Sequence, residues 1–298
     1  MLKLPVEGGC LCAGVRYRIS GEPRGADYCH CRMCRRAAGA PVVARLTVAD
    51  AAFAWIEGQP AVCRSSADAE RLFCPTCGSQ LALRDEPDHL DLALASLDDP
   101  EAIRPSRHIW TASRICWFET ADDLPRYSGN CRVTSAERGS RKPRGESSAG
   151  MTLASGSEEQ SMKLPLEGGC LCGRMRYRIE GAPRDAGYCH CRMCQRAAGA
   201  PVVPWLTAAR QEFAWTAGEP AVYASSPGAE RLFCPACGSQ LVFRALAEPE
   251  TLDVTLASLD DPAPIAPGHH IWTTSRIPWF ETRDDLPRYP ERGPASAG

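Results

Sequence analysis

Seven cysteines occur twice in this chain, at positions that differ by a constant 160 residues. Each set has the pattern C-x-C, then C-x-C-x-x-C, then C-x-x-C. Thiols this closely spaced are typical of metal ligands, and an all-sulfur set favours zinc. The fourteen predicted ligands are Cys10, Cys12, Cys29, Cys31, Cys34, Cys74, Cys77, Cys170, Cys172, Cys189, Cys191, Cys194, Cys234 and Cys237.

Other uses of these cysteines are open but less favoured. Disulfides would need an oxidising compartment, and each copy has an odd number of repeated cysteines. Free cysteines also serve as small core side chains, although that role does not require such regular spacing. An iron–sulfur cluster would accept four cysteines as readily as zinc does.

We expect the seven cysteines of each copy to divide into a closed site and an open site. The C-x-x-C pair before Gly78 forms a tight knuckle that presents two sulfurs to one ion. The C-x-C pair, read as an extended segment with both side chains on one face, supplies two more. The closed sites are therefore Cys10, Cys12, Cys74 and Cys77, and Cys170, Cys172, Cys234 and Cys237.

The other three cysteines of each copy leave a second ion one ligand short of four. They are Cys29, Cys31 and Cys34, and Cys189, Cys191 and Cys194. Zinc on three thiolates is a weak Lewis acid, and its natural fourth ligand is another soft thiolate. The sequence therefore favours a thiol-bearing ligand, while a zinc-bound hydroxide stays open. We expect about two zinc ions per domain and about four per chain.

Other residues near these motifs could bind a ligand or only support the fold. We expect His30 to be a hydrogen-bonding neighbour, His108 to be structural, and Trp110 and Trp117 to be core residues. Guanidinium groups can clamp the carboxylates of a ligand. The weak substrate-binding candidates are Arg32, Arg36, Arg114, Arg192, Arg196 and Arg276.

Three further cysteines are not repeated. Cys63 corresponds to Tyr223, Cys116 to Pro278, and Cys131 lies between the copies. We expect them to take no part in metal binding.

The repeat is long enough to be a duplicated domain. KLPVEGGCLC, YCHCRMCRRAAGAPVV, AERLFCPTCGSQL and HIWTASRICWFET all have a near-identical second copy. We expect domains at 1–128 and 162–290, a flexible linker at 129–161 rich in Ser, Gly, Arg and Glu, and a loose tail at 291–298.

Within a copy the pattern is mostly that of β-strands. Val15, Tyr17 and Ile19 alternate with polar residues, as do the leucines near residue 92, and Phe53 opens another strand. A short helix is expected after Cys31, with Gly39 to end it. The expected fold is all-β: two small tandem domains that need metal to complete their cores.

Composition excludes several function classes. The formal net charge is −2 and neither copy contains a basic run, which argues against a nucleic-acid partner. No apolar run long enough for a membrane span or a signal peptide is present. We therefore expect a cytoplasmic protein with reduced thiols, of undetermined oligomeric state.

The motifs GGCLC, YCHCRMC, FCPTCGSQL and HIWTASRICWFE, with DDLPRY at the end of each copy, resemble the glutathione-dependent formaldehyde-activating enzyme family, which includes centromere protein V. The resemblance covers nearly all of both copies. It implies a β-tent-like zinc fold with two ions per domain, one in a structural four-cysteine site and one in a three-cysteine site near which glutathione binds.

The leading hypothesis is a zinc-dependent carbon–sulfur lyase that acts on adducts of glutathione, or another small thiol, with an aldehyde. A second hypothesis is a non-catalytic zinc module that binds a thiol or a protein partner. A third is zinc storage or redox sensing.

Overall fold

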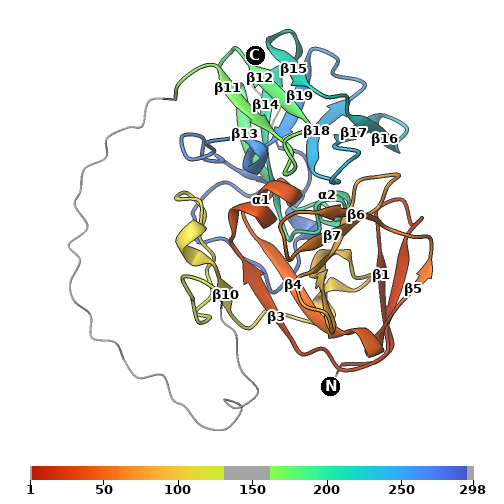
Figure 1. Ribbon diagram of the computed structural model, residues 1–298. Helices are drawn as coiled ribbons and strands as arrows, with labels where there is room; N and C mark the ends of the chain where they lie inside the picture. Colours follow the sequence, from red (N-terminus) through yellow and green to blue (C-terminus); the bar gives the residue numbers. More distant parts are fainter. Residues whose placement is uncertain (1, 131–161, 294–298) are drawn as a thin grey trace.

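The computed structural model describes residues 2–130 and 162–293, which hold the two copies of the repeat (Figure 1). Each copy contains a three-stranded sheet, a seven-stranded sheet and one short α-helix among its described residues. The predicted fold class, two tandem and mostly β domains, is confirmed. The linker predicted at 129–161 lies outside the described residues from 131 onward, and so does the predicted tail from 294 onward.

In the first copy the sheet orders are β1-β2-β5 and β10-β3-β4-β9-β8-β7-β6. The elements are β1 (Val6–Gly9), β2 (Arg16–Ile19), β3 (Gly25–Cys29), α1 (Arg32–Ala38), β4 (Val43–Ala49), η1 (Asp50–Ala52), β5 (Phe53–Glu57), β6 (Ala61–Arg64), β7 (Glu70–Phe73), β8 (Gln80–Arg84), β9 (His89–Ala93), η2 (Leu94–Ser96), η3 (Pro100–Ala102), β10 (His108–Ile109) and η4 (Thr111–Ser113), where η marks a 3-10 helix.

The second copy repeats these orders as β11-β12-β15 and β16-β17-β18-β19-β14-β13-β20. Its elements are β11 (Leu166–Gly169), β12 (Arg176–Ile179), β13 (Asp185–Cys189), α2 (Arg192–Ala198), β14 (Val203–Ala209), η6 (Arg210–Glu212), β15 (Phe213–Ala217), β16 (Ala221–Ser226), β17 (Ala229–Phe233), β18 (Gln240–Ala245), β19 (Thr251–Thr255), η7 (Leu256–Ser258), β20 (His270–Ile271) and η8 (Thr273–Ser275).

The strands follow the alternation in the sequence. In β2 the side chains of Tyr17 and Ile19 are fully buried, whereas Arg18 between them is exposed. The residues of β2 face those of β5 in an antiparallel pair, with Tyr17 opposite Trp55. Period-two burial is what a sheet with one solvated face requires, so the pattern alone was sufficient to predict these strands.

The short predicted helix is also present. Cys31 is the N-cap of α1, and its sulfur accepts a hydrogen bond from the backbone N–H of Cys34. Gly39 ends the helix with φ 68°, a left-handed conformation that a glycine adopts without a Cβ penalty. This capped helix fixes the spacing between Cys31 and Cys34.

One strand of the large sheet brings a distant segment to the cysteines. β10 pairs in parallel with β3, with His108 opposite Tyr28 and Ile109 opposite Cys29. Residues 80 positions apart in the chain therefore lie side by side next to the second cysteine motif.

The two copies pack into one body. The helices α1 and α2 lie close together where the two sets of sheets meet (Figure 1). One apolar cluster contains Cys29, Cys34 and Ala38 together with their counterparts Cys189, Cys194 and Ala198. The side-chain amides of Gln80 and Gln240 donate reciprocally to the carbonyls of Cys237 and Cys77, at 3.0 and 3.1 Å.

No helix among the described residues is both long and apolar enough to cross a membrane.

Candidate metal centres

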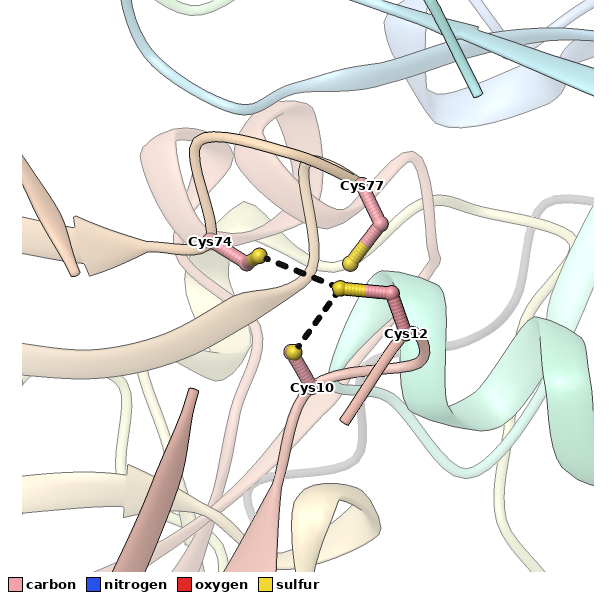
Figure 2. Close-up of side chains that lie close together, drawn as sticks. All are labelled: Cys10, Cys12, Cys74 and Cys77. Carbon is pink, nitrogen blue, oxygen red and sulfur yellow. Dashed lines mark hydrogen bonds between the residues drawn. The ribbon is translucent and has the colours of Figure 1, made fainter. Parts of the chain in front are cut away.

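The four cysteines of the predicted closed site lie together in the first copy. Figure 2 shows the sulfurs of Cys10, Cys12, Cys74 and Cys77 turned toward a common centre. The Cys12 sulfur is 3.4 Å from that of Cys10 and 3.6 Å from that of Cys74. In the second copy the same two separations are 3.4 and 3.7 Å.

The C-x-C pair reaches this centre by a turn and not by an extended segment, so that part of the prediction is wrong. Cys10 follows the end of β1, and the chain then reverses, with the N–H of Cys10 donating to the carbonyl of Val15 and the N–H of Ala13 donating to the carbonyl of Cys10. Adjacent glycines and small residues allow the reversal. The turn brings both sulfurs to one side, which alternation along a strand would also have allowed.

Ser79 joins the two halves of the closed site. Its buried hydroxyl accepts from the N–H of Leu11 at 2.9 Å and lies 3.2 Å from the Cys77 sulfur. The knuckle itself is closed by the N–H of Gly78, which donates to the carbonyl of Cys74. Gly78 has φ 70° and so takes the left-handed conformation that the knuckle needs. Ser79 was not predicted, although it stands next to the knuckle in both copies.

The three-cysteine groups are also assembled as predicted. Cys29 ends β3, Cys31 caps α1 and Cys34 lies in its first turn. The sulfurs of Cys29 and Cys34 are 3.6 Å apart, and all three lie within 4.8 Å of one another. Cys31 is half-buried while the other two are buried, so any open ligand position lies on the Cys31 side.

These separations fit zinc. A tetrahedral ion with sulfur ligands at about 2.3 Å needs sulfurs about 3.8 Å apart, and the measured separations fall just below that value. No histidine or carboxylate belongs to any of the four clusters in the described part of the chain. Four groups of thiols could thus each hold a metal ion, and soft sulfur donors suit zinc.

Buried arginines contact the open groups, and the sequence analysis missed them. Arg45 and Arg71 each direct a guanidinium nitrogen to the Cys34 sulfur at 3.5 Å. In the second copy Arg231 does the same to Cys194 at 3.3 Å. Arg71 and Arg231 are both 2% exposed. Their signal was an arginine on the buried face of the apolar strand before each C-x-x-C knuckle.

These guanidinium groups favour the thiolate form. Hydrogen bonds from Cys29 and Cys31 lower the pKa of Cys34 well below its usual value, and the charges of Arg45 and Arg71 act in the same direction. Two nitrogens of Arg71 have no hydrogen-bond partner of their own. A buried cation needs a nearby anion, which deprotonated cysteines supply. The fold therefore favours a thiolate at Cys34.

The histidines form a separate hydrogen-bonded chain. His30 Nε2 lies 2.9 Å from His108 Nδ1, and His108 Nε2 lies 2.9 Å from a carboxylate oxygen of Asp122. Burial, and then the neighbouring His108, lowers the pKa of His30 to about 3. His190, His270 and Asp284 repeat the arrangement. The prediction of His30 as a hydrogen-bonding neighbour is confirmed, and a structural role for His108 stays a prediction that its hydrogen bonds to His30 and Asp122 support.

The candidate arginines lie at the junction of the two copies. Arg36 pairs with Asp260 at 2.9 Å, and Arg196 pairs with Asp98. Arg32 and Arg192 donate to backbone carbonyls of the opposite copy, those of Asp260 and Ala95 among them. Arg114 and Arg276 instead pair with glutamates of their own copy.

The sequence analysis also made predictions for two tryptophans and for the three cysteines that are not repeated. Trp110 was expected in the core but is 41% exposed, because it opens a 3-10 turn with φ 59°. Trp117 is half-buried and donates to the carbonyl of Pro262 in the other copy. Cys63 and Cys116 lie outside the four clusters, and Cys131 lies outside the described residues.

The chain resembles a known protein family and a solved structure. The model of a family described as glutathione-dependent formaldehyde-activating enzyme matches residues 5–113 and again residues 165–275. A crystal structure of a Rhodobacter sphaeroides protein is 25% identical over 32% of this chain and 87% of that chain, with a TM-score of 0.28. No curated protein matches the chain.

Proposed function

The chain belongs to the family of glutathione-dependent formaldehyde-activating enzymes, and from this membership we propose that it makes and breaks the carbon–sulfur bond of adducts between a small thiol and an aldehyde. Glutathione is the thiol that the family description names. In the forward direction the thiol sulfur bonds to the carbonyl carbon, the C=O becomes C–O–H, and the thiol proton moves to that oxygen. The step balances without an oxidant, a reductant or a further reactant.

The observation that carries this proposal is a cluster of three thiols beside a buried arginine, open on the side of Cys31. We assign a zinc ion to Cys29, Cys31 and Cys34 and another to Cys189, Cys191 and Cys194. When bound there, zinc supplies one free position that suits a soft sulfur ligand. With structural ions on the two four-cysteine groups, the proposal requires four zinc ions per chain.

The arginine side chains have two roles in this proposal, one at the metal ion and one toward the ligand. The buried guanidinium of Arg71 balances the negative charge that three thiolates leave on a divalent ion. Carboxylates of a thiol would be drawn toward Arg32, Arg36 and Arg114, which line one cavity at the junction of the copies. Their counterparts Arg192, Arg196 and Arg276 are engaged by protein groups. So many metal-binding thiols require a reducing compartment, and we place the protein in the cytoplasm.

The proposal is tested by the rate of thiol–aldehyde exchange, since adducts of this kind also form without a catalyst. Exchange spectroscopy by NMR on mixtures of glutathione and formaldehyde should show faster interconversion when zinc-loaded protein is added. Cys31→Ser together with Cys191→Ser should abolish the acceleration, whereas Cys116→Ser, which changes an exposed cysteine outside the clusters, should keep it. Binding of glutathione without faster exchange would instead favour a non-catalytic thiol-binding module.

A further inference from the structure

A cavity of about 320 Å³ lies at the junction of the two copies, beside α1. Its wall from the first copy carries Arg32, Arg35, Arg36 and Arg114, and its wall from the second copy carries Asp260 and Asp261. Four guanidinium groups thus face two carboxylates. The volume is at the lower end for small-molecule sites, and the excess of positive charge favours an anionic occupant.

Arg32 and Arg35 are the two arginines of this cavity without a carboxylate partner among the described residues, and of the two only Arg35 is buried. Its side chain is 9% exposed, and its Nε donates to the carbonyl of His30 at 3.0 Å. No carboxylate pairs with it, and no acceptor for its two terminal nitrogens is found, among residues 2–130 and 162–293. Because Arg35 lines the cavity, its charge is available to an anion that enters there.

The neighbouring arginines are better satisfied. Arg36 pairs with Asp260, which also pairs with Arg176. Arg114 lies 3.3 Å from a carboxylate oxygen of Glu119. The side chains around Asp260 hold its pKa at about 2, first through the hydrogen bond from Arg176. Asp260 is therefore already engaged by two arginines, and Asp261 accepts a hydrogen bond from the backbone N–H of Ala263. Arg35 keeps its charge available for a ligand.

The equivalent position in the second copy has no such charge. Gln195 replaces Arg35 and is fully buried. Its amide nitrogen donates to the carbonyl of His190 at 2.7 Å and to that of Ser275 at 2.9 Å. Arg192, the counterpart of Arg32, donates to its side-chain oxygen and to the carbonyls of Ala95 and Leu97. In the second copy, the donors of Arg192 and Gln195 at the junction are therefore hydrogen-bonded to other protein groups.

The three-cysteine group of the first copy also has more positive charge around it than that of the second copy. Cys34 receives guanidinium contacts from both Arg45 and Arg71, whereas Cys194 receives one from Arg231. Trp205 stands at the position of Arg45. The first copy therefore has two more positive charges around its open cysteine group than the second, in the cavity and behind the sulfurs. Both differences favour an anionic thiol on the first copy.

We propose that the chain binds one anionic thiol and not two: the carboxylates of a small peptide-like thiol occupy the cavity at α1, with Arg35 as the binding residue that the second copy lacks. The identification of the occupant as a thiol rests on the proposed function, while its negative charge is inferred from the excess of arginines in the cavity wall. A thiol with two carboxylates, such as glutathione, has the charge and size that the cavity fits.

The test is calorimetric titration of the full zinc-loaded chain with S-methylglutathione, which keeps the carboxylates and blocks the thiol. We expect one ligand per chain. Arg35→Gln should weaken binding about tenfold or more, because a hydrogen bond to a charged group is lost. This variant reproduces the second copy, where Gln195 keeps the hydrogen bond to the preceding carbonyl, so the fold and the zinc content should not change.

Arg64→Gln is the matched control, because it removes the same charge from a side chain that is 75% exposed and outside the cavity. Two ligands per chain, equal affinities for Arg35→Gln and Arg64→Gln, or no binding would overturn the inference without touching the proposed reaction. Conversely, one ligand bound through Arg35 with no acceleration of thiol–aldehyde exchange would leave the inference in place and remove the proposed reaction.

Discussion

At the scale of single residues, the most informative contacts are those between buried arginines and cysteine sulfurs. Arg231 is the single guanidinium found on Cys194 among the described residues, while Cys34 has two. Each such cation lies in a region from which water is excluded, where a charge-assisted hydrogen bond is stronger than at the surface. The two open cysteine groups should therefore differ in how strongly they depend on one arginine.

Arg231→Met should weaken zinc binding at the second three-cysteine group about tenfold or more, because the charge-assisted contact with Cys194 is lost. Arg71→Met should weaken the first group less, since Arg45 still contacts Cys34. Competition with a chromophoric zinc chelator measures both. Arg64→Met, on the surface, is the control. Equal losses for the two buried substitutions would show that Arg45 does not share the charge.

At the scale of elements, short capped segments place the ligands. α1 has only seven residues, and it begins at the Cys31 N-cap and ends at the Gly39 C-cap. Isolated helices of this length do not persist in water, so packing must hold it. The helix lies against η7 of the other copy, which makes the copy-to-copy junction part of what orders the cysteine group.

Gly39→Ala should destabilise the protein more than Gly173→Ala, although both glycines have positive φ. An added Cβ at Gly39 would lie 2.6 Å from Cβ of Thr255, whereas at Gly173 no atom lies within 4 Å. The strain of a left-handed alanine costs about 1–2 kcal/mol at either site, and overpacking adds about 1–3 kcal/mol at Gly39.

Thermal or chemical unfolding measures the difference. Gly173→Ala is a strict control, because Ala13 already stands at the equivalent position of the first copy with φ 61°. Similar losses for both variants would mean that Thr255 moves aside freely.

Asp253 on β19 should make stability depend on pH. Burial raises its pKa to about 6 from the usual 3.8, against the hydrogen bond from Thr207 at 2.6 Å. Because the folded protein binds this proton more tightly than the unfolded chain does, protonated Asp253 contributes to the free energy of unfolding. This contribution is fully present below about pH 3.8 and is lost as the pH rises through about 6. Between pH 5 and 7.5 the loss should be about 1.4 kcal/mol, one pKa unit in free energy.

Asp253→Asn should remove this slope, because the amide stays neutral at every pH. Urea unfolding at several pH values above 5 measures it, and the difference between the two proteins should shrink as pH falls. An unchanged slope in the variant would assign the pH dependence to another group.

At the scale of the whole molecule, the repeat forms an internal dimer. Each copy donates to the other through equivalent residues: Gln80 and Gln240 to the carbonyls of Cys237 and Cys77, and Trp117 and Trp279 to those of Pro262 and Pro100. A β-bridge joins Thr120 to Thr282. The knuckle of each four-cysteine group is thus covered by the opposite copy.

A chain cut at a protease site inserted between residues 131 and 161 should therefore elute as one species in size-exclusion chromatography. The double variant Gln80→Leu, Gln240→Leu should weaken the association of the halves about thirtyfold, since two buried hydrogen bonds are worth about 2 kcal/mol together. Separation of the unaltered halves after cleavage would contradict the internal dimer.

Much of the fold and of the candidate metal centres could be predicted from the sequence alone. The grouping of cysteines, the short helix ending at Gly39 and the alternating strands all depend on local spacing, and local geometry decides them. The prediction of an extended C-x-C segment was wrong because a turn and a strand can present the same two sulfurs. Trp110 was misplaced because a backbone turn, and not hydrophobicity, sets its exposure.

The sequence by itself determined which atoms are chemically competent: fourteen thiols in two repeated sets, with a duplicated framework to hold them. Only the tertiary structure decided which arginines reach the sulfurs, because strand pairing and not sequence spacing brings Arg45 on β4 and Arg71 on β7 to Cys34. It also decided that the copies differ. In the sequence, Arg35 and Gln195 are simply different residues at equivalent positions of the two copies. The packing at the junction places Arg35 in the wall of a cavity, whereas Gln195 is buried and donates hydrogen bonds to two backbone carbonyls.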